Sequence, residues 1–180
     1  MKRLKVKSEY REFRKSVFDN MKIKADSHAG ISGIIVDIVV NNRVLTMVIF
    51  ACGKTDIYVS NVKSFFKDRG KYETTRKVTI SCIDKIEKLL PKMELTTDFK
   101  LCSDARENVF IFTDKGIYNL KITGNKEADK KDIVGFSRFL YKRILIEYLN
   151  AESYSCMTRK CSCCLFGNFF GSCIIKKIVN

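Results

Sequence analysis

The pattern of apolar and polar positions in the first 60 residues predicts one helix followed by three strands. Apolar side chains recur at helical spacing between charged residues over 6–21, which indicates an amphipathic helix. Residues 32–40 and 43–50 are rich in β-branched side chains, and Asn41-Asn42 between them is typical of a two-residue hairpin turn. A glycine-containing break precedes 55–59, which we expect to be the third strand of an antiparallel meander.

The pattern of the second half predicts a helix, a hairpin and another helix. Apolar positions from Val78 to Met93 lie on one helical face, and Pro91 is expected to end that helix. Two apolar runs flank Asp114-Lys115-Gly116, where a hairpin turn needs a glycine with positive φ. A further apolar repeat over 133–149 predicts a third helix.

This order of elements predicts an α+β fold. Most successive strands are joined by tight turns, and tight turns connect antiparallel strands only. We therefore expect a five-stranded, mainly antiparallel sheet packed with about three helices, forming a single basic domain over residues 1–150. Residues 151–180 form a separate cysteine-rich apolar tail, expected either to pack on the body or to be disordered. No transmembrane segment is expected.

Composition places the chain among folded proteins and makes it strongly basic. Hydrophobic residues account for 46% and charged residues for 30%, which is enough for an ordinary core. The 34 Lys and Arg against 20 Asp and Glu give a net charge of +14, which attracts polyanions without selecting one. A lysine-rich, tryptophan-free composition is also typical of AT-rich genomes, so the charge identifies no partner.

One segment, 63–77, combines basic and aromatic residues. Its members are Lys63, Lys67, Arg69, Lys71, Arg76 and Lys77, with Phe65, Phe66 and Tyr72. Such a mixture can hold phosphates while stacking on exposed bases. The alternative interpretation, which we favour, turns the aromatic rings into the core and leaves the charges as a solvated rim.

The cysteines indicate a reducing compartment and a weak metal candidate. The charged N-terminus is unlike a signal peptide, and three cysteines lie singly in the body, so we expect a cytoplasmic protein. The tail cysteines are Cys156, Cys161, Cys163, Cys164 and Cys173. Thiolates bind zinc, but this spacing lacks the paired Cys-x-x-Cys elements of a standard site. The apolar stretch 165–175 before Lys176-Lys177 is compatible with peripheral membrane contact.

No catalytic motif and no cofactor-binding motif is recognisable. Asp26, Ser27 and His28 are adjacent, but successive side chains point apart, so an exposed loop is the favoured interpretation. Asp98 follows two threonines and is interpreted as a turn or capping acid. If a pocket exists, Tyr58, Asp98 and His28 are the residues near which we would expect it.

Part of the chain resembles a family of small uncharacterised bacterial proteins. The resemblance rests on a strand ending in Asp56-Ile57-Tyr58-Val59-Ser60, a helix, the segment 95–101 containing Thr-Thr-Asp-Phe, and the 114–116 hairpin turn. It covers roughly 33–122 and implies no activity. The family pattern has a glycine-rich loop after the strand, whereas 61–70 here contains one glycine, which puts any ligand of that loop in doubt.

Three functional hypotheses follow from the sequence. The first is a non-enzymatic binding or regulatory module of the bacterial cytoplasm, without a cofactor, whose partner is a macromolecule and a protein in preference to nucleic acid. The second is a nucleic-acid-binding protein using 63–77, and the third is a small enzyme with an unrecognised site.

Overall fold

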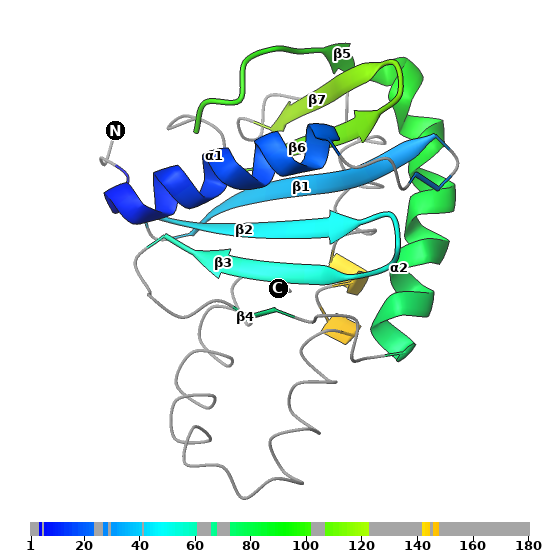
Figure 1. Ribbon diagram of the computed structural model, residues 1–180, viewed down its shortest axis with the longest axis horizontal. Helices are drawn as coiled ribbons and strands as arrows, with labels where there is room; N and C mark the ends of the chain where they lie inside the picture. The colour runs from blue at the N-terminus through cyan, green and yellow to red at the C-terminus, as the bar shows by residue number, and fades with distance from the viewer. Residues whose placement is uncertain are drawn as a thin grey trace, which may run out of the picture.

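The computed structural model describes residues 4, 6–23, 27–28, 30–40, 42–60, 66–67, 73–101, 107–122, 142–144 and 146–147. They form one antiparallel sheet with a helix on each face (Figure 1). The helices are α1 (Ser8–Ile23) and α2 (Glu73–Ile86), the latter continued by the 3₁₀ helix η1 (Glu87–Lys92). The strands are β1 (Ile31–Val40), β2 (Arg43–Phe50), β3 (Thr55–Val59), β4 (Phe66–Lys67), β5 (Glu94–Leu95), β6 (Glu107–Thr113) and β7 (Gly116–Ile122).

The α+β class and the antiparallel sheet are confirmed, but the expected count of five strands is wrong. Within the described residues the sheet has seven strands in the order β4-β3-β2-β1-β6-β7-β5, and every neighbouring pair is antiparallel. The five longer strands are those predicted. The two additional strands, β4 and β5, have two residues each and lie at the two edges. A two-residue strand has no detectable periodicity, so only its pairing in the folded chain defines it.

The predicted turns close the two hairpins. Asn42 has a φ of 62° where β1 turns into β2, and Gly116 has a φ of 128° where β6 turns into β7. Residues at positive φ are favoured in such two-residue hairpin turns. The central contact of the sheet is the pairing of β1 with β6, which joins the meander to the second hairpin.

The first two predicted helices are present, but α2 begins at Glu73, before the apolar pattern starts at Val78, and its end also differs. This α-helix ends at Ile86, and Pro91 lies within the following 3₁₀ helix. Proline cannot continue an α-helical hydrogen-bond ladder, which explains the change of helix type before it. Of the predicted third helix, the described residues 142–144 and 146–147 are helical, and Ile144 is buried. The rest of that helix and the whole tail 151–180 lie outside the described residues.

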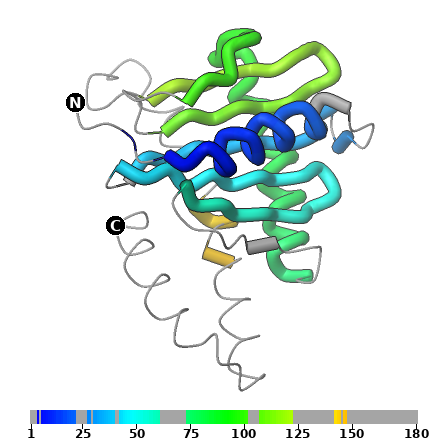
Figure 2. Tube along the Cα trace, turned by 60° about the vertical axis from the view of Figure 1, so that its left-hand side comes forward, coloured from blue at the N-terminus to red at the C-terminus, as the bar shows by residue number. Residues whose placement is uncertain are grey.

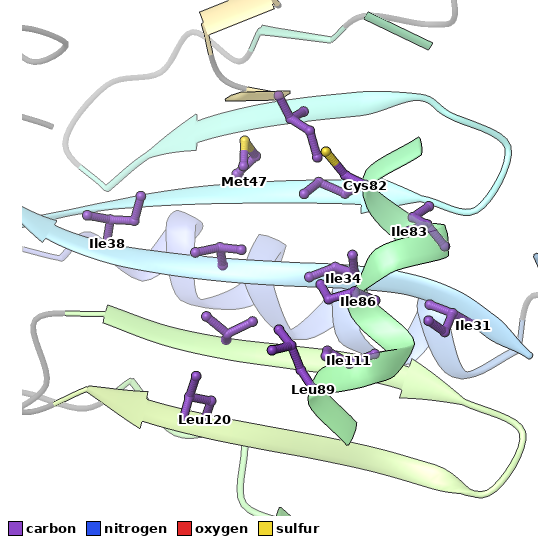
Figure 3. Close-up of a cluster of buried hydrophobic side chains, with 14 of the residues drawn as sticks. Ile31, Ile34, Ile38, Met47, Cys82, Ile83, Ile86, Leu89, Ile111 and Leu120 are labelled. Carbon is purple, nitrogen blue, oxygen red and sulfur yellow. The ribbon is translucent and has the colours of Figure 1, made fainter. Parts of the chain in front are cut away.

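Two apolar layers enclose the sheet. Successive strand residues point to opposite faces, so each strand contributes to both layers. On one face α2 packs Cys82, Ile83 and Ile86 onto the sheet, and η1 adds Leu89 (Figure 3). On the other face α1 packs Tyr10, Val17, Phe18 and Met21, and Figure 2 shows the two helices on opposite sides of the strands. Within the described residues, no helix is both long and apolar enough to cross a membrane.

Candidate functional site

One row of side chains across the sheet is polar, in the middle of the apolar layer under α1. Direct pairing aligns Tyr58 with Thr46, Thr46 with Asp37, Asp37 with Asn108, and Asn108 with Lys121. Directly paired residues project to the same face of a sheet. This polar row therefore crosses β3, β2, β1, β6 and β7. The next row is apolar at its centre, because Val48, Ile35 and Phe110 are aligned there.

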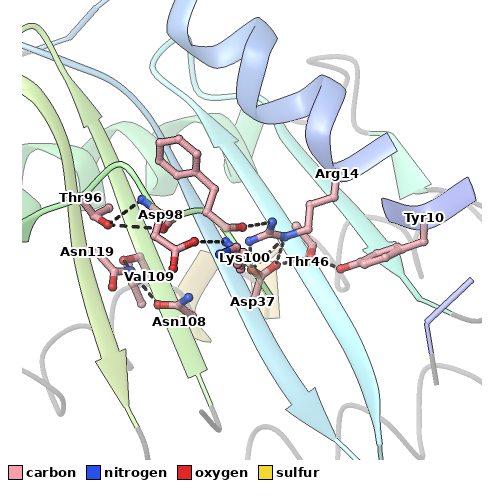
Figure 4. A network of polar contacts seen from close by, with 11 residues as sticks. Tyr10, Arg14, Asp37, Thr46, Thr96, Asp98, Lys100, Asn108, Val109 and Asn119 are labelled. Carbon is pink, nitrogen blue, oxygen red and sulfur yellow. Dashed lines mark hydrogen bonds and ion pairs between the residues drawn. The ribbon is translucent and has the colours of Figure 1, made fainter. Parts of the chain in front are cut away.

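A buried ion pair lies at the centre of the polar row. Arg14 on α1 is 6% exposed and Asp37 on β1 is 3% exposed. The Arg14 Nη2 and Nε atoms lie 2.6 and 3.1 Å from Asp37 Oδ2 (Figure 4). Arg14 Nη1 donates to the carbonyl oxygen of Phe99, and the guanidinium lies 4.4 Å from the ring centroid of Phe18. One guanidinium therefore joins α1, the central strand and the segment that follows β5.

The hydrogen bonds around Asp37 have a defined direction. The Thr46 hydroxyl donates to Asp37 Oδ1, and a hydroxyl has a single proton. The short hydrogen bond between Tyr10 and Thr46 must therefore be donated by the tyrosine. Burial raises the pKa of Tyr10 above its usual 10.0, and the Asp37 charge raises it further, while the Thr46 hydrogen bond and Arg14 oppose this shift. Tyr10 thus keeps its proton and remains a donor near neutral pH.

The two charged groups of this network compensate one another inside the protein. A buried charge costs several kcal/mol unless a partner compensates it, and here each buried charge has the other as its partner. We call Tyr10, Arg14, Asp37, Thr46 and the Phe99 carbonyl the Arg14 network. Its hydrogen bonds and ion pair attach α1 and residues 96–101 to the sheet. By spacing Arg14 falls on the apolar face of the first helix, four residues after Tyr10 and three before Val17, and sequence inspection missed this signal of a buried charge.

The structure gives separate partners to Tyr58, His28 and Asp98. Tyr58 packs against Phe13 with ring centroids 4.1 Å apart and ring planes tilted by 38°, and its hydroxyl donates to Asp56 over 2.9 Å. Burial, and then the Asp56 charge, raise the pKa of Tyr58. His28 Nε2 lies 2.5 Å from Asp84 on α2, on the opposite side of the sheet. The hydrogen bonds of these three residues thus involve three different partners, Asp56, Asp84 and Lys100.

Asp98 stabilises a local turn. Its carboxylate accepts a hydrogen bond of 3.0 Å from the Lys100 amide, and its own amide donates to Thr96 Oγ1 over 3.1 Å. Both patterns are side-chain turns of the kind that Asp and Thr form two residues along the chain. The interpretation of Asp98 as a turn acid is confirmed.

Part of the basic segment 63–77 is described. Arg76 and Lys77 lie in the first turns of α2, where Glu73 faces them at 3.8 and 3.7 Å. Arg76 Nε also donates to the Cys52 carbonyl. Phe66 and Lys67 form β4. Lys63, Phe65, Arg69, Lys71 and Tyr72 lie outside the described residues, as do all five tail cysteines.

The described surface carries little of the excess positive charge. Its residues include 18 Lys or Arg and 13 Asp or Glu, a net +5 out of the +14 of the whole chain. Of the body cysteines, Cys82 is buried and Cys52 is exposed. Across the ranges that the structure describes, no three His, Cys, Asp or Glu side chains gather into a metal site.

The most exposed large hydrophobic side chain among the described residues is at an edge of the sheet. On the α2 face, an apolar row runs through Ile49, Ile34, Ile111, Tyr118 and Leu95 by direct strand pairing. The first three are at most 2% exposed, whereas Leu95 on β5 is 62% exposed. The row thus continues past the area that α2 covers. Sequence inspection missed this because one leucine before Thr96 has no periodic neighbours.

Comparison with models of known families, with curated proteins and with solved structures finds no match for this chain. The resemblance to small uncharacterised bacterial proteins therefore stays a prediction.

Proposed function

We propose that this chain is a non-enzymatic binding module that contacts another protein through the β5 edge of its sheet. The observation that carries the proposal is the 62% exposure of Leu95 at the end of an otherwise buried apolar row. The bacterial and cytoplasmic setting expected from the sequence belongs to the same proposal.

The energetic argument is that docking would remove this apolar surface from water. Full burial of a leucine side chain is worth about 1.5–3 kcal/mol. Contiguous exposed apolar surface rimmed by polar residues is typical of interaction sites, and here Leu95 extends the apolar row at the sheet edge between Glu94 and Thr96. The edge also has backbone groups available for pairing, because β5 pairs with β7 on one side and is the last strand of the sheet formed by the described residues.

The Arg14 network supports a binding role over a catalytic one. Its donors and acceptors stabilise the attachment of α1 and of the segment after β5, which places β5 on a fixed framework. The mixture of charges at the start of α2 supports a protein partner in preference to a polyanion, because Glu73 offsets part of the positive charge of Arg76 and Lys77 there.

A site-specific photo-crosslinker tests the proposal. Benzoylphenylalanine is introduced at Leu95, and in a matched control at Lys88, which is exposed on η1. In cells that make the protein, we expect crosslinked products from position 95. Protease should degrade the crosslinked partner, and nuclease should not. Equal adducts from both positions would contradict the proposal, as would adducts that only nuclease removes, which would instead support the nucleic-acid hypothesis.

A further inference from the structure

We infer that β5 accepts an extended peptide segment of the partner as an additional strand, and that this segment has an apolar residue next to a basic one. This inference rests on the proposed function and specifies the chemistry of the partner. It is carried by the pairing of β5 with β7, by the two faces of β5 and by the charge of Glu94.

The backbone of Leu95 has the orientation that strand addition needs. The Thr96 amide donates to the Ile117 carbonyl over 2.8 Å, so Thr96 directs its hydrogen-bonding groups toward β7. In an antiparallel ladder these groups alternate in direction from one residue to the next. The N–H and C=O of Leu95 therefore point away from β7, to the side on which the described residues place no further strand. An added strand would form its pair of backbone hydrogen bonds with this residue.

The α2 face of β5 selects an apolar side chain. Leu95 is paired with Tyr118, and a side chain at Gly116 would approach the Leu95 Cδ2 atom to 3.0 Å. Leu95 therefore lies against the backbone at the β6–β7 turn, with the rest of its surface exposed. A residue of the added strand opposite Leu95 would project to this same face and extend the apolar row by one position.

The α1 face of β5 selects a basic side chain. Glu94 is exposed and pairs with Asn119, which has no charge to neutralise it. The residue of the added strand opposite Glu94 would lie next to the residue opposite Leu95 and point to the other face. A lysine or arginine there would pair with the carboxylate, and opposite charges in directly paired strand positions are favourable. The predicted segment thus alternates basic and apolar residues.

A second copy of the chain is a less suitable occupant. Two copies would each bring a net charge of +14 to the contact. A short peptide segment brings far less positive charge than a second copy, even where it is basic.

Peptide binding followed by NMR tests the inference on the full chain. The probes are the capped peptides Lys-Val-Lys-Val-Lys and Glu-Val-Glu-Val-Glu, with a form of the first that is N-methylated at both valines and so lacks the amide donors. We expect the lysine peptide to shift the Leu95 amide resonance and slow its hydrogen exchange. The N-methylated form should bind about tenfold more weakly or worse.

A charge exchange gives the sharpest control. Glu94→Lys should reverse the preference in favour of the glutamate peptide, whereas Glu87→Lys, the same change at an exposed position on η1, should not. The inference is overturned if the N-methylated peptide binds equally well, if the shifts centre on another surface, or if none of the peptides binds at millimolar concentration. Dimerisation of the free chain that Leu95→Ser abolishes would also overturn it, with a second copy as the occupant.

The two proposals fail in different ways. Protein adducts from position 95 without peptide binding would sink strand addition and leave the proposed function standing. Peptide binding at Leu95 without adducts in cells would support strand addition and count against the function proposed for the edge.

Discussion

Replacing Asp37 by asparagine removes the charge that compensates Arg14 and should destabilise the fold strongly. The guanidinium would remain 6% exposed next to a neutral amide, and one amide group cannot accept all the hydrogen bonds that the carboxylate accepts from Arg14 and Thr46. Breaking a buried ion pair by removing one partner typically costs about 3–5 kcal/mol. The free energy of unfolding of a domain is about 5–15 kcal/mol, so the loss would be a large share of it.

Urea unfolding followed by far-ultraviolet circular dichroism measures this loss, since the chain has no tryptophan to report by fluorescence. The matched control is Glu73→Gln, which removes a carboxylate that is 62% exposed and lies 3.7 Å from Lys77. Exposed pairs of this kind contribute about 0–1 kcal/mol. The control should therefore unfold at nearly the parent urea concentration.

A double variant separates loss of the pair from burial of an uncompensated charge. Arg14→Met with Asp37→Leu removes both charges, and apolar replacement of a buried pair is often neutral. We expect the double variant to be more stable than Asp37→Asn alone, although it loses more hydrogen bonds. The explanation is refuted if Asp37→Asn costs no more stability than Glu73→Gln. It is also refuted if the double variant loses more stability than the sum of the losses measured for Arg14→Met alone and Asp37→Leu alone.

Two further predictions concern the α1 face. The free energy of unfolding should fall as pH rises above about 10, since the unfolded chain releases its tyrosine protons near the usual pKa of 10.0 while burial makes the folded chain hold those of Tyr10 and Tyr58. The urea midpoint of the double variant with Tyr10→Phe and Tyr58→Phe should fall less across this pH range than that of the parent chain. An equal fall in both proteins would count against the prediction. Gly33→Ala should lower the free energy of unfolding by about 1–3 kcal/mol and so lower the urea midpoint. The added Cβ would lie 2.5 Å from Met21 Sδ and 2.7 Å from the Ile49 carbonyl oxygen. An unchanged midpoint would show that α1 and β2 can move apart at no cost.

The sequence by itself determined the elements whose signal is local. The five longer strands, the two helices that flank them and both hairpin turns follow from periodicity and turn chemistry within windows of about ten residues. Asn42 and Gly116 take the positive φ that those turns require. The α+β class follows in the same way, because strands joined by tight turns must be antiparallel.

The tertiary structure decided what depends on residues distant in sequence. Arg14 meets Asp37 across 23 positions and the Phe99 carbonyl across 85, so no local pattern marks them as partners. The pairing of β1 with β6 aligns the polar row, and the extent of α2 leaves Leu95 exposed. Tyr58, Asp98 and His28 were grouped by residue type alone, and folding gives them separate partners. Which side chains meet, and which stay exposed, is set by packing between elements and not by their individual patterns.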